Sequence, residues 1–509
     1  MKNKFVRRFP GFLVTGLLFL AMIMFLIILA STKILPAKFL LIAGGIFLLI
    51  TLCVFFLTRD ARKPQLLIFG CVVTLVVLIL ELVTTGYLVR GVNTLGGITT
   101  VDGEIAEVGV YVRTDDPAQN LSDLNEHRFG ILTELDRENT DKTISLIKQQ
   151  LHAGLVLTEY EGLTALVDSL ITNDETDVII LNSAYLELLR DMDGYADAVG
   201  QLRQLHVEKV ETAPVLPTPS NNGGFWESLF GPGKDDPEQP VATQNQPFVM
   251  YISGIDTRGS ISAKSRSDVN ILAVVNPNTH QVLLLSTPRD YYVPLSISNG
   301  IPDKLTHAGI YGIDVSMDTL EMLYDVPIDY YFRVNFNGFE DIVDALGGIT
   351  VHSDIAFTSS VYSSPDATYY FQQGQNTLNG TAALVFARER YAFADGDRQR
   401  GENQMKVIRG VIEKAMSPAL LTNYVSIMDS VSGSFETSMP YDKIAELVRN
   451  QLDDGGSWNI SSYSVSGRDE LRVPYSLSFE VYVMIPDEST VQTAREKIDQ
   501  VLSGQMLQP

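Results

Sequence analysis

The first 90 residues consist mainly of three apolar runs separated by short polar segments. The runs cover residues 12–30, 39–57 and 66–89. Each comes close to, or exceeds, the roughly 20 residues that a helix needs to cross about 30 Å of hydrocarbon. The first run is longer than the apolar core of a cleaved signal peptide, which has about 7 to 15 residues, and two further runs follow it. We therefore predict a membrane region with three transmembrane helices in residues 1–95.

Basic residues are distributed unevenly around these runs and predict their orientation. Segments 1–11 and 58–65 are rich in Lys and Arg, whereas segment 31–38 contains only two basic residues. By the positive-inside rule the N-terminus is cytoplasmic, and three crossings place everything after Arg90 on the outer side of the cell membrane. The residues left on the cytoplasmic side are too few to form a DNA-binding or kinase domain.

Between residues 102 and 213, short apolar runs alternate with segments of helical periodicity. Strands are expected at 108–112, 129–132 and 177–181, and helices at 140–151 and 184–192. This pattern predicts a small extracellular α/β accessory domain over residues 102–213, followed by a Pro/Gly-rich linker over residues 214–246. We find no motif for chemistry in the accessory domain, so the simplest interpretation is a spacer or a recognition module.

The alternation of strands and helices becomes denser from residue 247 to residue 501. Strands are expected at 248–253, 269–275, 281–285 and 479–485, and helices at 315–324, 336–346, 381–389, 404–416, 441–452 and 490–501. Such an order predicts an α/β domain of the α-β-α type, with a central sheet and helices on its faces.

Charge restricts the kind of partner that the chain can bind. Residues 1–100 contain 10 Lys and Arg against 2 Asp and Glu, whereas the whole chain contains 38 against 61 and has a net charge of −23. The part after the membrane region is therefore strongly acidic. This argues against nucleic acid as a partner, because a nucleic-acid binder needs basic residues along a groove. An anionic ligand would have to bind at local clusters of arginine.

Two aspartates lie at the ends of neighbouring predicted strands. Asp256 follows the first strand of the large domain and Asp268 precedes the second, so both carboxylates can meet at one edge of the sheet. Mg²⁺ prefers one or two protein oxygens together with phosphate oxygens and water. The pair therefore predicts a magnesium site, and the alternative is that both aspartates only cap turns.

Arginines are concentrated after the third strand of this domain and before its fourth helix. Arg289 follows the strand directly and could bind a phosphate bidentately, while Asp290 could orient it. The second cluster comprises Arg388, Arg390, Arg398 and Arg400, with Gln404 one helical turn beyond. Arginines so close together in an acidic domain repel one another unless an anion lies between them. The clusters predict a diphosphate site and a displacement at phosphorus.

Asp397 lies inside the second arginine cluster. A carboxylate in that position is a candidate general base for an attacking hydroxyl group. Alternatively, it only orients Arg390 or Arg400.

These motifs, taken in order, resemble those of the LytR-CpsA-Psr family over about residues 247–501. The segments that carry the resemblance are 254–258, 266–268, 286–290, 304–308, 346–348, 374–380, 388–390 and 397–404. The three spans and the accessory domain are similar to the capsule-type branch of that family. One departure is Asn403, which stands where many relatives have arginine.

The resemblance implies a Mg²⁺-dependent transferase of Gram-positive bacteria. Such a protein moves a glycopolymer, for example capsular polysaccharide or a teichoic-acid-like polymer, from undecaprenyl pyrophosphate to peptidoglycan. The family implies that Asp256 and Asp268 bind Mg²⁺ and that Asp397, Arg289 and Arg390 are catalytic. The implied pyrophosphate-binding residues are Arg266, Arg289, Arg388, Arg390, Arg400 and Gln404, with Arg398 as a further candidate. The lipid tail would occupy an apolar tunnel between sheet and helices.

Two alternative functions use the same residues. The first is a polyprenyl-pyrophosphate phosphatase, in which water is the nucleophile. The second is a lipid-sensing regulator without catalytic activity, which would act through capsule assembly proteins.

Overall fold

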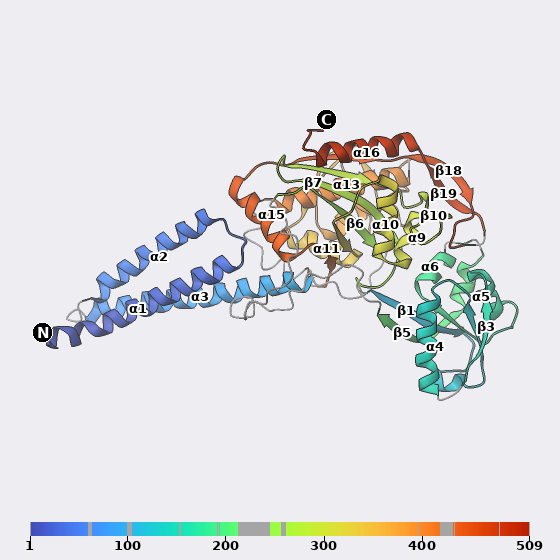
Figure 1. The fold of residues 1–509 in the computed structure, drawn as a ribbon, viewed down its shortest axis with the longest axis horizontal. Coiled ribbons are helices and arrows are strands. Elements are labelled where there is room, and N and C mark those ends of the chain that lie inside the picture. The colour runs from blue at the N-terminus through green and yellow to red at the C-terminus, as the bar shows by residue number, and fades with distance from the viewer. Residues whose placement is uncertain are drawn as a thin grey trace.

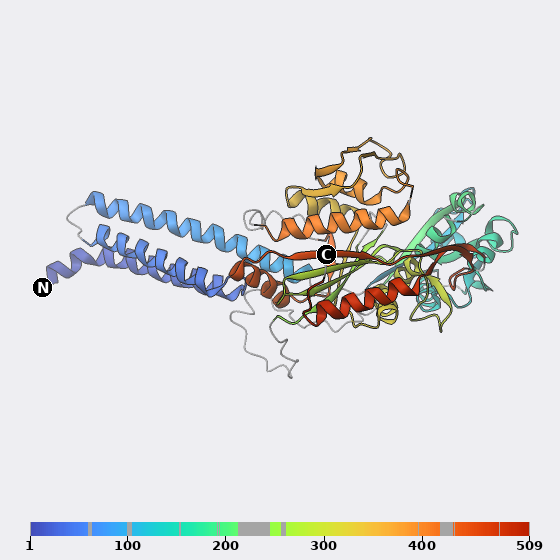
Figure 2. The same cartoon turned by 90° about the horizontal axis from the view of Figure 1, so that it is seen from above.

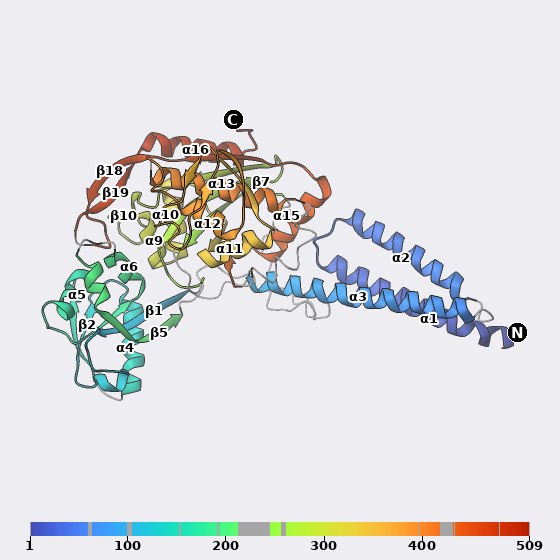
Figure 3. The ribbon, with the colours of Figure 1, turned by 180° about the vertical axis from the view of Figure 1, so that it is seen from behind.

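The chain forms a helical membrane region, a small domain and a large domain (Figure 1). The computed structural model describes residues 2–59, 64–98, 104–151, 154–190, 192, 194–211, 245–255, 261–394, 396–417, 431, 433–477 and 479–507. Most of the predicted linker lies outside these residues. The small domain and the helical region lie at opposite ends of the large domain (Figures 1 and 3).

The N-terminal region consists of α1 (Lys2–Ser31), α2 (Ala37–Thr58) and α3 (Pro64–Ile98). All three helices are long and apolar enough to cross a membrane, over Gly11–Ser31, Ala37–Thr58 and Gln65–Arg90. The predicted apolar runs are thus confirmed as helices. The turn between α1 and α2 contacts the large domain, where the hydroxyl of Tyr441 donates to the carbonyl of Thr32 at 2.8 Å.

The small domain contains one five-stranded sheet in the order β3-β2-β4-β1-β5. Its elements are β1 (Ile105–Arg113), η1 (Leu121–Leu124), β2 (Arg128–Leu132), α4 (Arg137–Leu151), β3 (Val156–Tyr160), α5 (Leu163–Ile171), β4 (Val178–Asn182), α6 (Ala184–Arg190), α7 (Ala196–Gly200) and β5 (Leu202–Glu211). Strands β3 and β5 are not among the predicted strands. Both are edge strands whose side chains, apart from Val210, are exposed or half-exposed, so they lack the apolar run that marks a buried strand.

The large domain is built on a six-stranded sheet in the order β16-β11-β6-β7-β8-β17. These strands are β6 (Phe248–Ile255), β7 (Ser267–Asn276), β8 (Gln281–Ser286), β11 (Tyr330–Val334), β16 (Phe435–Thr437) and β17 (Asn459–Ser464). The central strands β6, β7 and β8 are antiparallel, whereas β11 and β17 pair in parallel with β6 and β8. Short strands around the sheet are β9 (Tyr292–Pro294), β10 (Pro302–Lys304), β12 (Ile349–Ser353), β13 (Phe357–Thr358), β14 (Tyr370–Phe371) and β15 (Gly374–Leu378).

Helices cover both faces of this sheet (Figure 2). One layer contains α9 (Leu305–Tyr311), α10 (Ile313–Tyr324) and α16 (Glu488–Leu502), and the other contains α11 (Phe336–Ala345), α12 (Gly380–Arg388), α13 (Asp397–Ala415) and α15 (Tyr441–Asp454). Side chains alternate along β7: Leu272 packs with α10 and α16, whereas Ile271 packs with α13. The predicted α-β-α class is confirmed.

The predicted last strand does not join the central sheet. Instead, β19 (Val481–Pro486) pairs with β18 (Gly467–Arg472) in a separate hairpin, and β17 occupies the sheet edge. Three serines and an asparagine make β17 too polar to be recognised as a strand. Helix α13 begins at Asp397, well before the predicted start at residue 404. Its first two turns are almost entirely polar, so they show no apolar periodicity from which a helix could be predicted.

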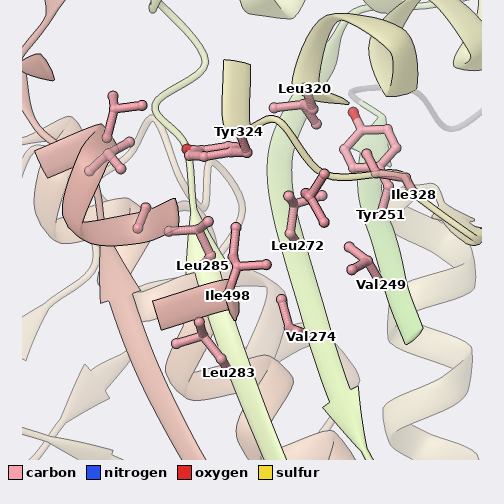
Figure 4. Packing of buried hydrophobic residues seen from close by; sticks show 14 of the residues in the cluster. Val249, Tyr251, Leu272, Val274, Leu283, Leu285, Leu320, Tyr324, Ile328 and Ile498 are labelled. Atoms are coloured by element: carbon pink, nitrogen blue, oxygen red, sulfur yellow. The ribbon is translucent and has the colours of Figure 1, made fainter. Parts of the chain in front are cut away.

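The layer of α10 and α16 forms the main core of the domain. In Figure 4, Ile498 of α16 lies beside Leu283 and Leu285 of β8. We expect Ile498→Ala to lower the free energy of unfolding by about 2–5 kcal/mol, because it removes transfer free energy and leaves a cavity. Thermal unfolding in detergent measures the change. Gln492→Ala, at an exposed position of the same helix, is the control, and equal midpoints for the two variants would contradict this packing.

Candidate functional site

A cavity of about 1070 Å³ lies between the sheet and the layer of α11, α12, α13 and α15. This exceeds the roughly 300–1,000 Å³ of common small-molecule pockets. Most of its wall is apolar, with Ile252 and Ala273 from the sheet, Val407 and Val411 from α13, and Leu447 from α15. Such a cavity can take a long hydrocarbon chain.

Charged side chains gather at one end of the cavity. The polar residues lining it there include Arg266, Asp268, Arg289, Arg388, Arg390, Arg400 and Gln404. The strand order explains why they meet: β7 begins where β8 ends, with Ile271 opposite Ser286. Helix α13 begins at the same end, since a Cβ on Gly401 would lie 3.4 Å from the Ser286 hydroxyl. The structure thus brings together six of the seven predicted pyrophosphate-binding residues.

Two carboxylates hold the guanidinium group of Arg289. Its Nη1 donates to Oδ1 of Asp268 at 2.9 Å, and its Nε lies 3.5 Å from Oδ2 of Asp290. Lys304 Nζ donates in turn to Oδ1 of Asp290 at 2.9 Å. Asp290 therefore orients Arg289, as the sequence suggested, and also links it to Lys304.

Both aspartates are ionised at neutral pH, although Asp290 is buried and the side chain of Asp268 is only 17% exposed. Burial of Asp268 opposes ionisation, but the charges of Arg289, Arg400 and Arg266 outweigh burial and hold the pKa of this carboxyl below its usual range. Burial likewise opposes ionisation of Asp290, where Lys304 and Arg289 outweigh it and keep its pKa low. The cavity end is thus a network of full charges.

Arg388, the last residue of α12, and Arg390, two residues beyond it, lie against aromatic rings. The guanidinium carbon of Arg388 is 4.4 Å from the centre of the Phe336 ring, and that of Arg390 is 4.7 Å from the Tyr391 ring. Stacking of this kind fixes the plane of a guanidinium. Arg390 is held further by Tyr391, whose hydroxyl accepts from Nη2 at 2.6 Å.

Glu389, between these two arginines, is fully buried and fixes the loop. Its carboxylate accepts hydrogen bonds from the Ser363 hydroxyl and from the backbone N–H groups of Ser360 and Ala392. Burial opposes its ionisation, but these donors outweigh burial and lower the pKa of Glu389. Sequence reasoning gave Glu389 no role, and its position between two arginines was the only available signal.

Comparison with known proteins connects this geometry to a family. A family model described as the LytR_cpsA_psr family matches residues 231–499. The chain belongs to the LytR-CpsA-Psr family. The predicted resemblance is confirmed.

Curated members of the family are similar over most of their own length. Polyisoprenyl-teichoic acid–peptidoglycan teichoic acid transferase TagU of Bacillus subtilis is 35% identical over 229 residues, which are 45% of this chain and 71% of the relative. The protein of the same name from Halalkalibacterium halodurans is 32% identical over 281 residues, 54% of this chain and 87% of the relative.

Solved structures of the family align with about half of the chain. The crystal structure of B. subtilis TagV is 27% identical with a TM-score of 0.43 and covers 52% of this chain and 100% of its own. The structure of TagT bound to LI-WTA is 27% identical with a TM-score of 0.41 and covers 53% of this chain and 95% of its own.

Arg398 is the predicted family residue that the structure does not bring to the cavity. Its side chain is exposed, and its Nη2 donates to the carbonyl of Gly467 at 2.8 Å. Asn403, the departure from the family pattern, is buried and donates from Nδ2 to the carbonyl of Phe386 in α12. Arg398 therefore does not take the place of the arginine that many relatives have at the position of Asn403.

Two predicted residues lie wholly or partly outside the described part of the chain. Asp256 lies outside the described residues, although Ile255 before it pairs with Ser267. Asp397 is the first residue of α13, but its side chain is outside the described part of the chain. Its assignment as general base stays a prediction.

One described residue at the cavity end, Asp268, is a suitable ligand for a magnesium ion. Asp268 supplies one ionised carboxylate beside five arginines, and Mg²⁺ needs only one or two carboxylates when phosphate oxygens complete its shell. Within the described ranges, no group of three or more His, Cys, Asp and Glu side chains could bind a metal by itself.

The lowered pKa of Asp268 predicts how stability depends on pH. Because the folded pKa lies below the unfolded value of about 3.9, the arginine partners stabilise the fold above that pH, and this contribution is lost as pH falls through the folded pKa. Asp268→Asn should therefore lower the unfolding midpoint most near neutral pH and least at the acid end. Thermal unfolding from pH 7 to about pH 3 in metal-free buffer measures this, with exposed Asp499→Asn as the matched control. A difference in unfolding midpoint between the wild type and Asp268→Asn that grows as the pH falls would contradict the lowered pKa of Asp268.

Proposed function

We propose that this protein transfers a glycopolymer from a polyprenyl-pyrophosphate carrier to peptidoglycan. The observation that carries the proposal is one cavity with a long apolar part and five arginines at its end. These parts match the two halves of a lipid pyrophosphate. Membership of a family whose curated members include teichoic acid transferases supports the same reaction. We take undecaprenyl as the lipid, and a capsular or teichoic-acid-like chain as the polymer.

The reaction is a displacement at phosphorus. A hydroxyl of peptidoglycan attacks the phosphorus that carries the glycan, the bridging P–O bond breaks, and polyprenyl phosphate leaves. The glycan keeps one phosphate, so the product is a phosphodiester. The arginines neutralise charge on the phosphoryl oxygens, and Arg289 is held for this by Asp268 and Asp290.

Two further groups would assist this reaction. Asp397, at the start of α13, would take the proton of the attacking hydroxyl. Mg²⁺ bound by Asp268 and Asp256 would supply additional positive charge at the diphosphate.

The membrane region supports a lipid-linked substrate. Helix α15 lines the apolar part of the cavity through Leu447 and Val448, and the same helix contacts the turn between α1 and α2. In addition, Lys33 pairs with Asp442 at 3.1 Å. We propose that this turn and both domains face the outer side of the cell membrane, where lipid-linked polymers meet peptidoglycan.

An attachment assay tests the proposed function. The full chain in detergent is incubated with Mg²⁺, a polyprenyl-pyrophosphate glycan and peptidoglycan fragments, and the phosphodiester product is measured. Arg289→Ala and Arg400→Ala should each lower the rate by about 100-fold, as expected for loss of one charge-stabilising donor. Arg398→Ala, which removes an arginine outside the cavity lining, should change it little.

Two results would contradict the proposal, and a third would contradict only the role of Mg²⁺. Phosphate release at the same rate without peptidoglycan would indicate the phosphatase. Polymer attachment in cells that is unaffected by Arg289→Ala would indicate a regulator. Full activity after chelation of Mg²⁺ would remove the metal from the mechanism.

The apolar part of the cavity predicts a dependence on lipid length. Ala415, at the end of α13, lines the cavity far from the arginines, and Ala415→Trp should fill that part. Turnover of a long-chain lipid substrate should fall severalfold more than turnover of a short-chain one. Glu413→Trp, on the exposed side of the same helix, controls for the added ring. Equal losses for both lipids would show that the tail lies elsewhere.

A further inference from the structure

Glu104, the residue before the first strand of the small domain, has its carboxylate inside the large domain. Its Oε1 accepts from Nη1 of Arg333 at 2.8 Å and from the backbone N–H of Ile313 at 3.1 Å. Arg333 lies in β11 and is 1% exposed, and Ile313 is the first residue of α10. Lys264 Nζ is 3.9 Å from the other oxygen, Oε2. A small-domain carboxylate therefore pairs with a buried arginine of the central sheet.

The next residue joins the small domain to the segment that leads into β7. The backbone N–H of Ile105 donates to the carbonyl of Ser262 at 2.9 Å, and the N–H of Lys264 donates to the carbonyl of Ile105 at 3.2 Å. These bonds form a parallel bridge between Ile105 and Ala263. Lys264 is only two residues before Arg266, so the small domain holds the backbone that delivers this arginine to the cavity.

A second contact acts on the side chain of Arg266 itself. Oε2 of Glu187, in α6 of the small domain, lies 3.9 Å from Nη2 of Arg266. Arg266 is 9% exposed and lines the charged end of the cavity. The small domain therefore contacts the side chain of this arginine and also the backbone of residues 262–264 shortly before it.

The opposite side of the same segment is closed by α9. A Cβ on Gly309 would come within 2.5 Å of the carbonyl of Ser265, so the helix packs directly on the backbone before Arg266. The rings of Tyr311 in α9 and Tyr185 in α6 lie 6.5 Å apart, and Ile310 belongs to the core of the small domain. The segment is thus enclosed between α9 and the small domain.

We propose that the small domain is a positioning module for the phosphate site and that Glu104 and Glu187 are its positioning residues. Glu104 and Ile105 fix the path of residues 262–264, and Glu187 fixes the guanidinium of Arg266. A spacer would need no carboxylate paired with a buried arginine of the sheet. The role in catalysis rests on the proposed function, whereas the mechanical coupling does not.

The test compares carboxylate-to-amide variants of the full chain in detergent. Glu187→Gln removes the charge facing Arg266 at a surface position and leaves the fold intact. Since Glu187 also pairs with Arg190, Arg190→Gln is the matched control, because it removes that pair and leaves the contact with Arg266. Glu104→Gln is the more disruptive variant, because it removes the carboxylate that pairs with the buried Arg333. Its control is Glu138→Gln, at an exposed site paired with Lys142.

Two readouts separate positioning from simple stability. Affinity for geranylgeranyl pyrophosphate should fall about 5- to 10-fold in Glu187→Gln and Glu104→Gln, because misplacing Arg266 weakens binding more than the loss of one carboxylate charge strengthens it, and it should not fall in the controls. In an Arg266→Gln background, Glu187→Gln should lower the affinity no further. Hydrogen exchange of residues 261–268 should be faster in Glu104→Gln only. The proposal is overturned if either variant behaves as its control, or if the effects of Glu187→Gln and Arg266→Gln are additive.

These readouts do not require transfer activity. If the wild-type chain binds the diphosphate but never attaches a polymer, the proposed function fails while the coupling is still measured. If attachment occurs but both variants exchange and bind like the wild type, the coupling fails while the proposed function stands.

Discussion

Mutual repulsion among arginines is the constraint on which the cavity end depends. Five guanidinium groups line one end of a largely apolar space, where unit charges about 4 Å apart interact with several kcal/mol even at an effective dielectric constant near 20. Asp268 and Asp290 reduce this repulsion and hold Arg289 between them. With Glu389 and Glu187, the described part of the chain places four carboxylates beside five arginines and Lys304. Under the proposed function, the remaining positive charge favours a polyanion such as a diphosphate.

The fold concentrates these charges because neighbouring strands reverse direction. The antiparallel order β6, β7, β8 places the start of β7 beside the end of β8, so Asp268 and Arg289 come from separate loops to the same edge. Helix α13 crosses that edge with its polar first turns and continues along the sheet with its apolar ones. One helix therefore contributes both to the charged end and to the hydrocarbon wall. This is why a polar head and an apolar tail can share one cavity.

The sequence was informative where the physical signal was local. Apolar runs predicted β6, β7 and β8, and the density of arginine predicted the cavity end, since such spacing rarely occurs without an anion. Polar strands such as β17 could not be recognised, because their formation depends on pairing with a strand far away in the chain. The same holds for Glu104, whose partner Arg333 is over two hundred residues away and lies in a strand without any motif. Arg398 was wrongly predicted to belong to the site. It is close to Arg400 in sequence, but its side chain does not line the cavity and donates to the carbonyl of Gly467.

The two ends of the cavity are attached to different parts of the molecule. The apolar end is lined by α15, which pairs with the turn between α1 and α2 through Asp442. The charged end is held by the small domain through Glu104 and Glu187. These attachments lie on opposite sides of the large domain (Figure 1), so the cavity has a fixed direction between the membrane helices and the small domain. Under the proposed function, the lipid tail points toward the membrane and the acceptor meets the pyrophosphate beside the small domain. An acceptor polymer can then approach the phosphorus without crossing the path of the lipid.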